Sequence, residues 1–173
     1  MKSVISVADG DAKIVTNDRW QLINDEAEET AVDKDSVILP LSLWQQRQSV
    51  EVLAGRESSA DGIYLSPDDD ETLLYPWLSV LPLIAIQFPS FRDGRGYTQA
   101  YMLRVRMGWA GELRAVGDVL RDQLSHMRQC GFDSFAVRED KSVEDALKGL
   151  RGLSVTYGRS VIEPKPLFRR RNL

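Results

Sequence analysis

The chain has 173 residues and a net charge of −4, which allows one domain with a substantial core and is too short for two ordinary domains. With a single cysteine, Cys130, the chain cannot form an intramolecular disulfide. The absence of disulfides is usual for proteins of a reducing cytoplasm. The longest apolar stretch is too short to span a bilayer and is interrupted by Pro76 and Pro82. We therefore expect one cytoplasmic domain over 1–173, with no signal peptide and no membrane segment.

The first 35 residues predict a small β-hairpin followed by an acidic connection. The apolar segments "AKIV" and "RWQLI" flank "TND", which is a plausible turn sequence. The following "NDEAEETAVDKD" is polar and acidic, as expected of an exposed connection.

From Ser36 onward, short apolar runs alternate with helical patterns. The expected strands are 36–41, 62–66, 83–88, 112–116, 134–137 and 154–157. Repeated strand–helix–strand units predict right-handed crossovers and an α/β fold with a mostly parallel sheet of about six strands. The sheet is either open or an incomplete TIM-like barrel. It forms an α/β core over 36–157, and 158–173 is expected to be an extended C-terminal tail.

Several of the predicted helices carry recognisable end signals. The expected helices cover 41–49, 68–80, the stretch after "FRDGRGY", 118–131 and 142–152. Asp118 and Ser142 are natural N-caps, and Gly131 and Gly152 are natural stops. Arg104 and Arg106 fall in the last turns of their helix, where cations complement the dipole.

Four consecutive acids, Asp68 to Glu71, begin the helix expected over 68–80. They suggest either anions that complement the helix dipole or a metal site. We favour the dipole interpretation, because no histidine or second carboxylate cluster lies nearby in the sequence. No metal is expected.

The strand 112–116 carries charge on one face. Glu112 and Arg114 alternate with Leu113 and Ala115, so the two charged side chains share a face. A strand covered on both faces is usually apolar throughout. This strand therefore lies at an edge of the sheet, or its charged face lines a barrel interior or a site.

Charge is unevenly distributed along the chain. Residues 1–75 hold 16 Asp and Glu against 6 Lys and Arg, whereas residues 76–173 hold 10 against 16. Between 92 and 138 all eight cations are arginine. Arginine suits a fixed contact with a carboxylate or an oxyanion. High genomic GC content, which favours arginine codons, is an alternative explanation. It explains the total number of arginines better than their clustering between 92 and 138.

The stretch "FRDGRGY" (91–97) predicts a small-anion site. A glycine turn between a strand and a helix presents free backbone N–H groups, and two arginines supply positive charge. The predicted anion-binding residues are Arg92, Gly94, Arg95, Gly96, Arg114 and Arg138, the last two from later strands. The alternative is structural: Asp93 caps the helix and the glycines form a tight turn.

Nucleotide-binding motifs do not fit this stretch. Gln99 stands where the dinucleotide fingerprint requires a third small residue, and a Walker motif is absent. The only histidine, His126, is expected on a solvated helix face, and Cys130 as a small buried apolar residue. One Cys and one His exclude an ordinary zinc site or a Cys-ligated iron–sulfur cluster within one chain. We expect no cofactor and no nucleic-acid partner, and we identify no catalytic residue.

The segment from "LPLIAIQFPSFRDGRGY" through "GELRAVGDVLRDQL" to "CGFDSF" resembles DUF934, a bacterial family of unknown function. Its genes commonly lie beside the sulfite reductase haemoprotein gene, and its members are described as oxidoreductases involved in sulfite reduction. The resemblance implies an accessory protein of sulfate assimilation, which binds a small anion or docks onto sulfite reductase or another sulfur-assimilation protein. The alternative is an anion-processing oxidoreductase that uses the 92–118 region. A homo-oligomer is compatible with either.

Overall fold

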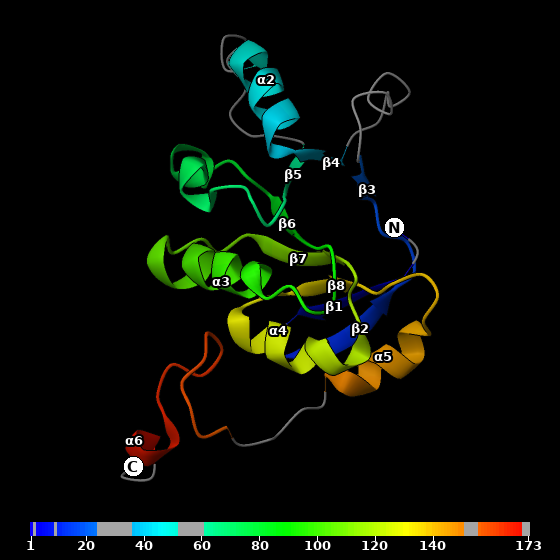
Figure 1. Ribbon diagram of the computed structural model, residues 1–173, viewed down its shortest axis with the longest axis vertical. Helices are drawn as coiled ribbons and strands as arrows, with labels where there is room; N and C mark the ends of the chain where they lie inside the picture. The colour runs from blue at the N-terminus through cyan, green and yellow to red at the C-terminus, as the bar shows by residue number, and fades with distance from the viewer. Residues whose placement is uncertain (2, 9, 24–35, 52–60, 151–155, 171–173) are drawn as a thin grey trace.

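The computed structural model describes residues 1, 3–8, 10–23, 36–51, 61–150 and 156–170 (Figure 1). Its strands form one eight-stranded sheet in the order β2-β1-β8-β7-β6-β5-β4-β3. These strands are β1 (Val4–Ala8), β2 (Asp11–Val15), β3 (Gln21–Leu22), β4 (Val37–Pro40), β5 (Gly62–Leu65), β6 (Leu83–Phe88), β7 (Glu112–Gly117) and β8 (Ser134–Ala136).

The described helices connect these strands or follow the last one. They are α2 (Leu41–Glu51), the 3₁₀ segments η2 (Glu71–Trp77) and η4 (Arg121–Gln123), α3 (Arg95–Tyr101) with its π-helical continuation η3 (Met102–Arg106), α4 (Leu124–Cys130), α5 (Val143–Gly149) and α6 (Leu167–Arg170). None of the described helices is long and apolar enough to cross a membrane.

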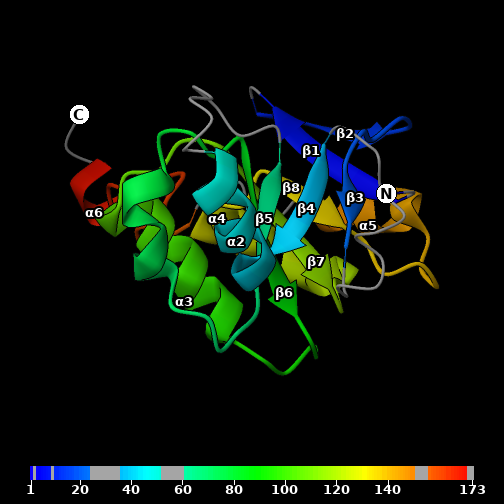
Figure 2. The ribbon, with the colours of Figure 1, turned by 90° about the horizontal axis from the view of Figure 1, so that it is seen from above.

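The prediction of a mostly parallel sheet is confirmed. From β3 to β8 every neighbouring pair is parallel, and the strands lie in chain order. Such a sequential order places consecutive crossovers on the same side, as in a barrel that has not closed. The sheet is an open, curled half-barrel, with α3 and α4 on one side of β6 and β7 and the N-terminal end on the other (Figure 2).

An N-terminal hairpin is present and includes the predicted strand "AKIV" as part of β2, but the partner of that strand is β1 and not residues 19–23. It pairs β1 with β2 antiparallel, with Ala8 opposite Asp11, and β1 then pairs with β8. The two-residue connection contains Gly10 at φ 89°, which glycine adopts at little cost. The Asp-Gly dipeptide at 9–10 was the stronger hairpin signal. The predicted second strand, 19–23, instead supplies β3, which pairs with β4 near the opposite edge.

Two predictions concerned the C-terminal part of the chain, a strand over 154–157 and an extended tail after it. The predicted strand 154–157 lies partly outside the described residues, and Thr156 and Tyr157 are not in a strand. The segment 158–170 is not an extended tail, because it folds back and ends in α6. The amide of Leu167 donates to the carbonyl of Tyr157 at 3.0 Å, which closes the segment on itself.

Two predicted helix ends are confirmed and one is wrong. Ser142 accepts from the amide of Asp145 at 3.1 Å and caps α5, and Gly131 ends α4 at φ 104°. The expected stop at Gly152 lies outside the described residues. Asp118 does not cap the next helix, which begins at Arg121. Its carboxylate binds other groups, described below.

The two faces of the sheet have different coverings. Residues such as Ile86, Phe88 and Leu113 point to the outer face and pack under the helices. The inner face carries a smaller cluster in which Leu83, Ala85 and Val116 pack against Trp20. Because β7 lies between β6 and β8, its charged residues do not mark an edge but lie on the inner face. The second alternative for this strand, a barrel interior, is therefore the correct one.

Candidate functional site

The two glycines of the predicted anion turn have different roles. A Cβ atom at Gly96 would lie 2.9 Å from Cζ of Phe88, so this glycine lets α3 pack closely on β6. At Gly94 the nearest atom, in Tyr97, would be 4.0 Å away, and the backbone is helical at φ −91°. Asp93 accepts from the amide of Arg95 at 3.1 Å, as the structural alternative anticipated. These contacts explain the turn without a ligand.

The positive charge at this turn is largely matched by acids. Arg95 forms ion pairs with Asp93 at 2.7 Å and with Asp68. The hydrogen bonds that Arg95 donates to Asp93, and then to Asp68, raise the pKa of Arg95 above its usual range. Arg92 is exposed and has no ion pair with another described residue. Arg92 is thus the cation at the turn that is left to meet an anion.

Gln99, which breaks the dinucleotide fingerprint, has a structural role. Its buried side-chain amide donates to the carbonyl oxygens of Ser66 at 2.9 Å and Asp69 at 3.0 Å. The hydrogen bonds join α3 to the loop after β5. A small residue at this position could not make them.

Arg138 and Asp118 link the turn to the loop after β8. One oxygen of Asp118 accepts from the amide of Phe91 at 2.7 Å, and the other accepts from Arg138 at 2.6 Å. Arg138 also binds Asp140, and this hydrogen bond lowers the pKa of Asp140 to about 2. The loops after β6, β7 and β8 are therefore joined at the carboxyl edge of the sheet, where open α/β sheets bind ligands.

Arg114 is not part of this edge. It lies on the inner face, with its side chain only 3% exposed, and it forms ion pairs with Asp18 and Glu112, both at 2.7 Å. Its Nε donates to Ser134 at 3.1 Å, and Ser134 donates to Glu112 at 2.6 Å. Burial alone would lower the pKa of Arg114, but the hydrogen bonds with Asp18 and Glu112 outweigh it, so the pKa is raised.

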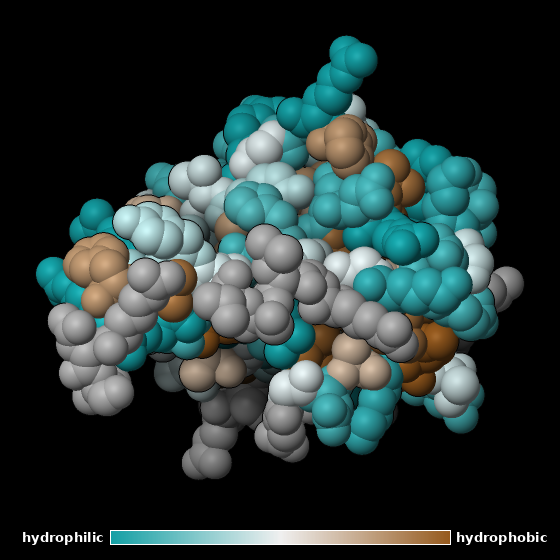
Figure 3. Space-filling model, turned by 90° about the horizontal axis from the view of Figure 1, so that it is seen from below, coloured by the Kyte–Doolittle hydropathy of each residue, from teal (hydrophilic) through white to brown (hydrophobic). Residues whose placement is uncertain are grey.

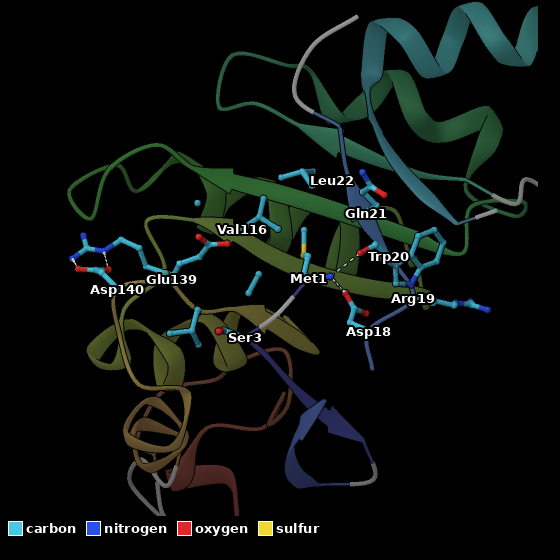
Figure 4. Close-up of a pocket in the computed structure, with 14 residues that line it drawn as sticks. Met1, Ser3, Asp18, Arg19, Trp20, Gln21, Leu22, Val116, Glu139 and Asp140 are labelled. Atoms are coloured by element: carbon cyan, nitrogen blue, oxygen red, sulfur yellow. Dashed lines mark hydrogen bonds and ion pairs between the residues drawn. The ribbon is translucent and has the colours of Figure 1, made fainter. Parts of the chain in front are cut away.

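A cavity of about 1060 Å³ opens beside this network. Val116 and Ala136 contribute apolar wall from the ends of β7 and β8, and residues 18–22 form the opposite wall. Figure 4 shows the amino group of Met1 between Asp18 and the carbonyl of Trp20, with Glu139 and Asp140 at the far end. Arg138 also lines the cavity. An apolar wall with a few fixed charges is typical of a small-molecule site.

Of the six predicted anion-binding residues, only Arg138 lines this cavity. Arg92, Gly94, Arg95 and Gly96 lie together at the β6–α3 turn, and Arg114 lies in the interior. No sequence signal pointed to the opposite wall of the cavity. Asp18 was assigned to a turn, and Trp20 to a hairpin strand, because only the folded sheet brings residues 18–22 across β7.

His126 and Cys130 lie together on α4. The sulfur of Cys130 is 3.9 Å from Nε2 of His126, and the His126 ring lies 4.7 Å from the ring of Tyr97. Burial raises the pKa of the Cys130 thiol, which is the opposite of what a nucleophile requires. His126 is exposed, as predicted, and Cys130 is partly buried.

The fold and this edge define an α/β protein built on an open, mostly parallel half-barrel, with a cavity at the carboxyl ends of β7 and β8. The family whose model matches residues 62–168 is described as a bacterial protein of unknown function, DUF934. This match covers more than half of the chain, and the chain belongs to the DUF934 family. A search of curated proteins finds no match.

Proposed function

We propose that this protein is a cytoplasmic accessory protein of assimilatory sulfite reduction that binds a small anionic ligand at the carboxyl edge of its half-barrel. The observation that carries the binding role is the cavity beside Arg138, whose charged lining is held in place by ion pairs. Fixed charges reduce the ordering cost of binding. The link to sulfite reduction rests on the resemblance, through the gene neighbourhood typical of the family.

Two groups of cations at this edge favour the binding of an anion. Arg138 lines the cavity, and its partner Asp118 also binds the amide of Phe91 in the β6–α3 turn. Arg92 and Arg95 lie in that turn. An anionic ligand that replaced Asp68 or Asp93 at Arg95 would accept charge-assisted hydrogen bonds from the same guanidinium group.

The alternative of an anion-processing enzyme has less support. A catalytic centre built from the 92–118 region requires Gly94, Gly96 and Arg114 to face one pocket with Arg138. The cavity is lined by Arg138 but not by the other three. We therefore favour a binding role over turnover.

Calorimetric titration with sulfite, sulfate and phosphate tests anion binding. We expect the wild type to bind at least one of them, and Arg95→Ala to weaken binding by about tenfold or more. Arg138→Ala measures the contribution of the cavity in the same way. Arg106→Ala is the control, because Arg106 is exposed at the end of η3, before β7 begins. If the wild type binds none of the three anions, or all variants bind equally, the anion proposal is wrong.

Growth of a deletion strain tests the physiological role separately. We expect the strain to grow normally with sulfide and poorly with sulfate or sulfite as the sulfur source. Expression of the wild-type chain should restore growth. Equal growth of the deletion strain on all three sources would contradict a role in sulfite reduction.

A further inference from the structure

The segment 156–170 forms a closed surface loop. Besides the Leu167–Tyr157 hydrogen bond, Arg170 donates to the carbonyl of Thr156 and pairs with Glu163 at 3.2 Å. A compact loop whose two ends meet in this way is an Ω-loop, a type that is frequently functional. We call residues 156–170 the C-terminal loop.

The C-terminal loop is anchored to the body of the protein through α4. The amide of Val161 donates to the carbonyl of Gln129 at 2.9 Å. The Val161 side chain also packs at Gly131, where an added Cβ would lie 3.1 Å from its Cγ1 atom. The loop therefore has a defined position, and its outward side chains are held in a fixed arrangement.

Apolar side chains are concentrated on the outside of this loop. Tyr157 is 73% exposed, and Ile162 and Phe168 are each 55% exposed. They are three of the seven large exposed apolar side chains among the described residues, although the loop is only 15 residues long. None of the residues in the loop is buried. Clustered exposed apolar groups of this kind mark interaction surfaces.

The same loop is positively charged. It contains four cations and one carboxylate, and that carboxylate, Glu163, is already paired with Arg170. Arg159, Lys165 and Arg169 form no ion pair with a carboxylate in the described part of the chain. Seen from below, the end of the molecule where α6 lies carries brown and tan residues next to teal ones (Figure 3). A complementary surface would combine apolar groups with carboxylates.

We propose that the C-terminal loop is a docking surface for a partner protein that presents carboxylates around an apolar patch. Ile162 is aliphatic and offers no ring for stacking a nucleic-acid base. The guanidinium of Arg169 lies 5.8 Å from the centre of the Phe168 ring, so that ring face is already occupied. Pro164 and Pro166 restrict the backbone of the loop and lower the entropy lost on binding. These features favour a protein over a nucleic acid.

The proposal deepens the accessory role inferred above, but its test uses neither anion binding nor growth on sulfate. A photo-crosslinking amino acid, p-benzoylphenylalanine, replaces Tyr157 in the full chain expressed in its own host. The matched control carries it at Tyr75, which is 69% exposed on η2. We expect a protein crosslinked from position 157 and not from position 75, identified by mass spectrometry.

The crosslinked protein is then purified, and its affinity is measured against the wild type and charge-reversed variants. We expect the triple variant Arg159→Glu, Lys165→Glu, Arg169→Glu to bind at least tenfold more weakly, and binding to weaken as salt rises. Arg121→Glu and Lys148→Glu are the controls, because both side chains are exposed, on η4 and α5, and belong neither to the C-terminal loop nor to the proposed anion site. Circular dichroism verifies that each variant is folded. The proposal is wrong if neither position yields a crosslink, or if both positions capture the same proteins. It is also wrong if the crosslinked product is a second copy of this chain or a nucleic acid, or if charge reversal leaves the affinity unchanged.

Discussion

Arginine has opposite roles in the two regions that the sequence had assigned to a single site. At the β6–α3 turn, Arg95 is 53% exposed and pairs with Asp93 and Asp68 in water. On the inner face, Arg114 is 3% exposed and pairs with Asp18 and Glu112. Exposed ion pairs contribute about 0–1 kcal/mol, whereas breaking a buried one leaves an uncompensated charge. The exposed arginine can exchange its acid for a ligand, and the buried one holds the fold.

The largest expected effect is at Arg114. Arg114→Ala should lower the free energy of unfolding by about 3–5 kcal/mol, because the buried Asp18 would lose its closer partner and keep only the Met1 amino group at 3.3 Å. Urea denaturation measures the change. Asp18→Asn added to Arg114→Ala should recover part of the loss, since it removes a buried carboxylate that the Met1 amino group alone would have to balance. A loss below about 1 kcal/mol for the single variant would mean that the buried ion pairs of Arg114 contribute no more to stability than exposed pairs such as those of Arg95. The proposed difference between the two arginines would then be wrong.

A smaller effect is expected at the glycines of the turn. Gly96→Ala should cost roughly 1–3 kcal/mol, because the new Cβ meets the Phe88 ring at 2.9 Å. Gly94→Ala should change stability by no more than about 0.5 kcal/mol, because the space around it is open. Thermal or urea unfolding of the two variants, measured side by side, checks this difference. Equal losses would show that the turn does not owe its glycine pattern to packing.

The smallest effect concerns the exposed pair of Arg138 and Asp140. The pKa of Asp140 is lowered to about 2 from its ordinary 3.8, chiefly by its hydrogen bond with Arg138. A carboxyl whose folded pKa is lowered stabilises the protein above its unfolded pKa. That contribution is lost as the pH falls from about 3.8 through about 2.

Titration of the Asp140 carboxyl by NMR tests this assignment. Arg138→Ala should move its midpoint from about 2 back toward 3.8, and added salt should act in the same direction. Arg121→Ala is the control, because Arg121 pairs with Asp145 instead. A wild-type midpoint near 3.8 would mean that the pair does not persist in solution.

The amino-acid sequence determined the parallel part of this fold. Runs such as "LIAIQF" are apolar at every position but Gln87, which indicates strands covered on both faces, and the helical patterns between them required crossovers on a sheet. Ser142 and Gly131 marked helix ends through local chemistry alone. Local signals succeed here because each depends on residues that are neighbours in the chain.

Only the tertiary structure decided what the charged residues do. The partner of Arg114 is Asp18, which lies 96 positions earlier in the chain, and that of Arg138 is Asp118 in the preceding loop. The sequence could predict that an arginine lies at the end of a strand. It could not predict which distant carboxylate would lie against that arginine in the folded sheet. The choice between a free cation and a neutralised one depends on that contact. Ion pairing and burial are long-range properties, and they separate the arginine that can bind a ligand from the arginine that holds the sheet together.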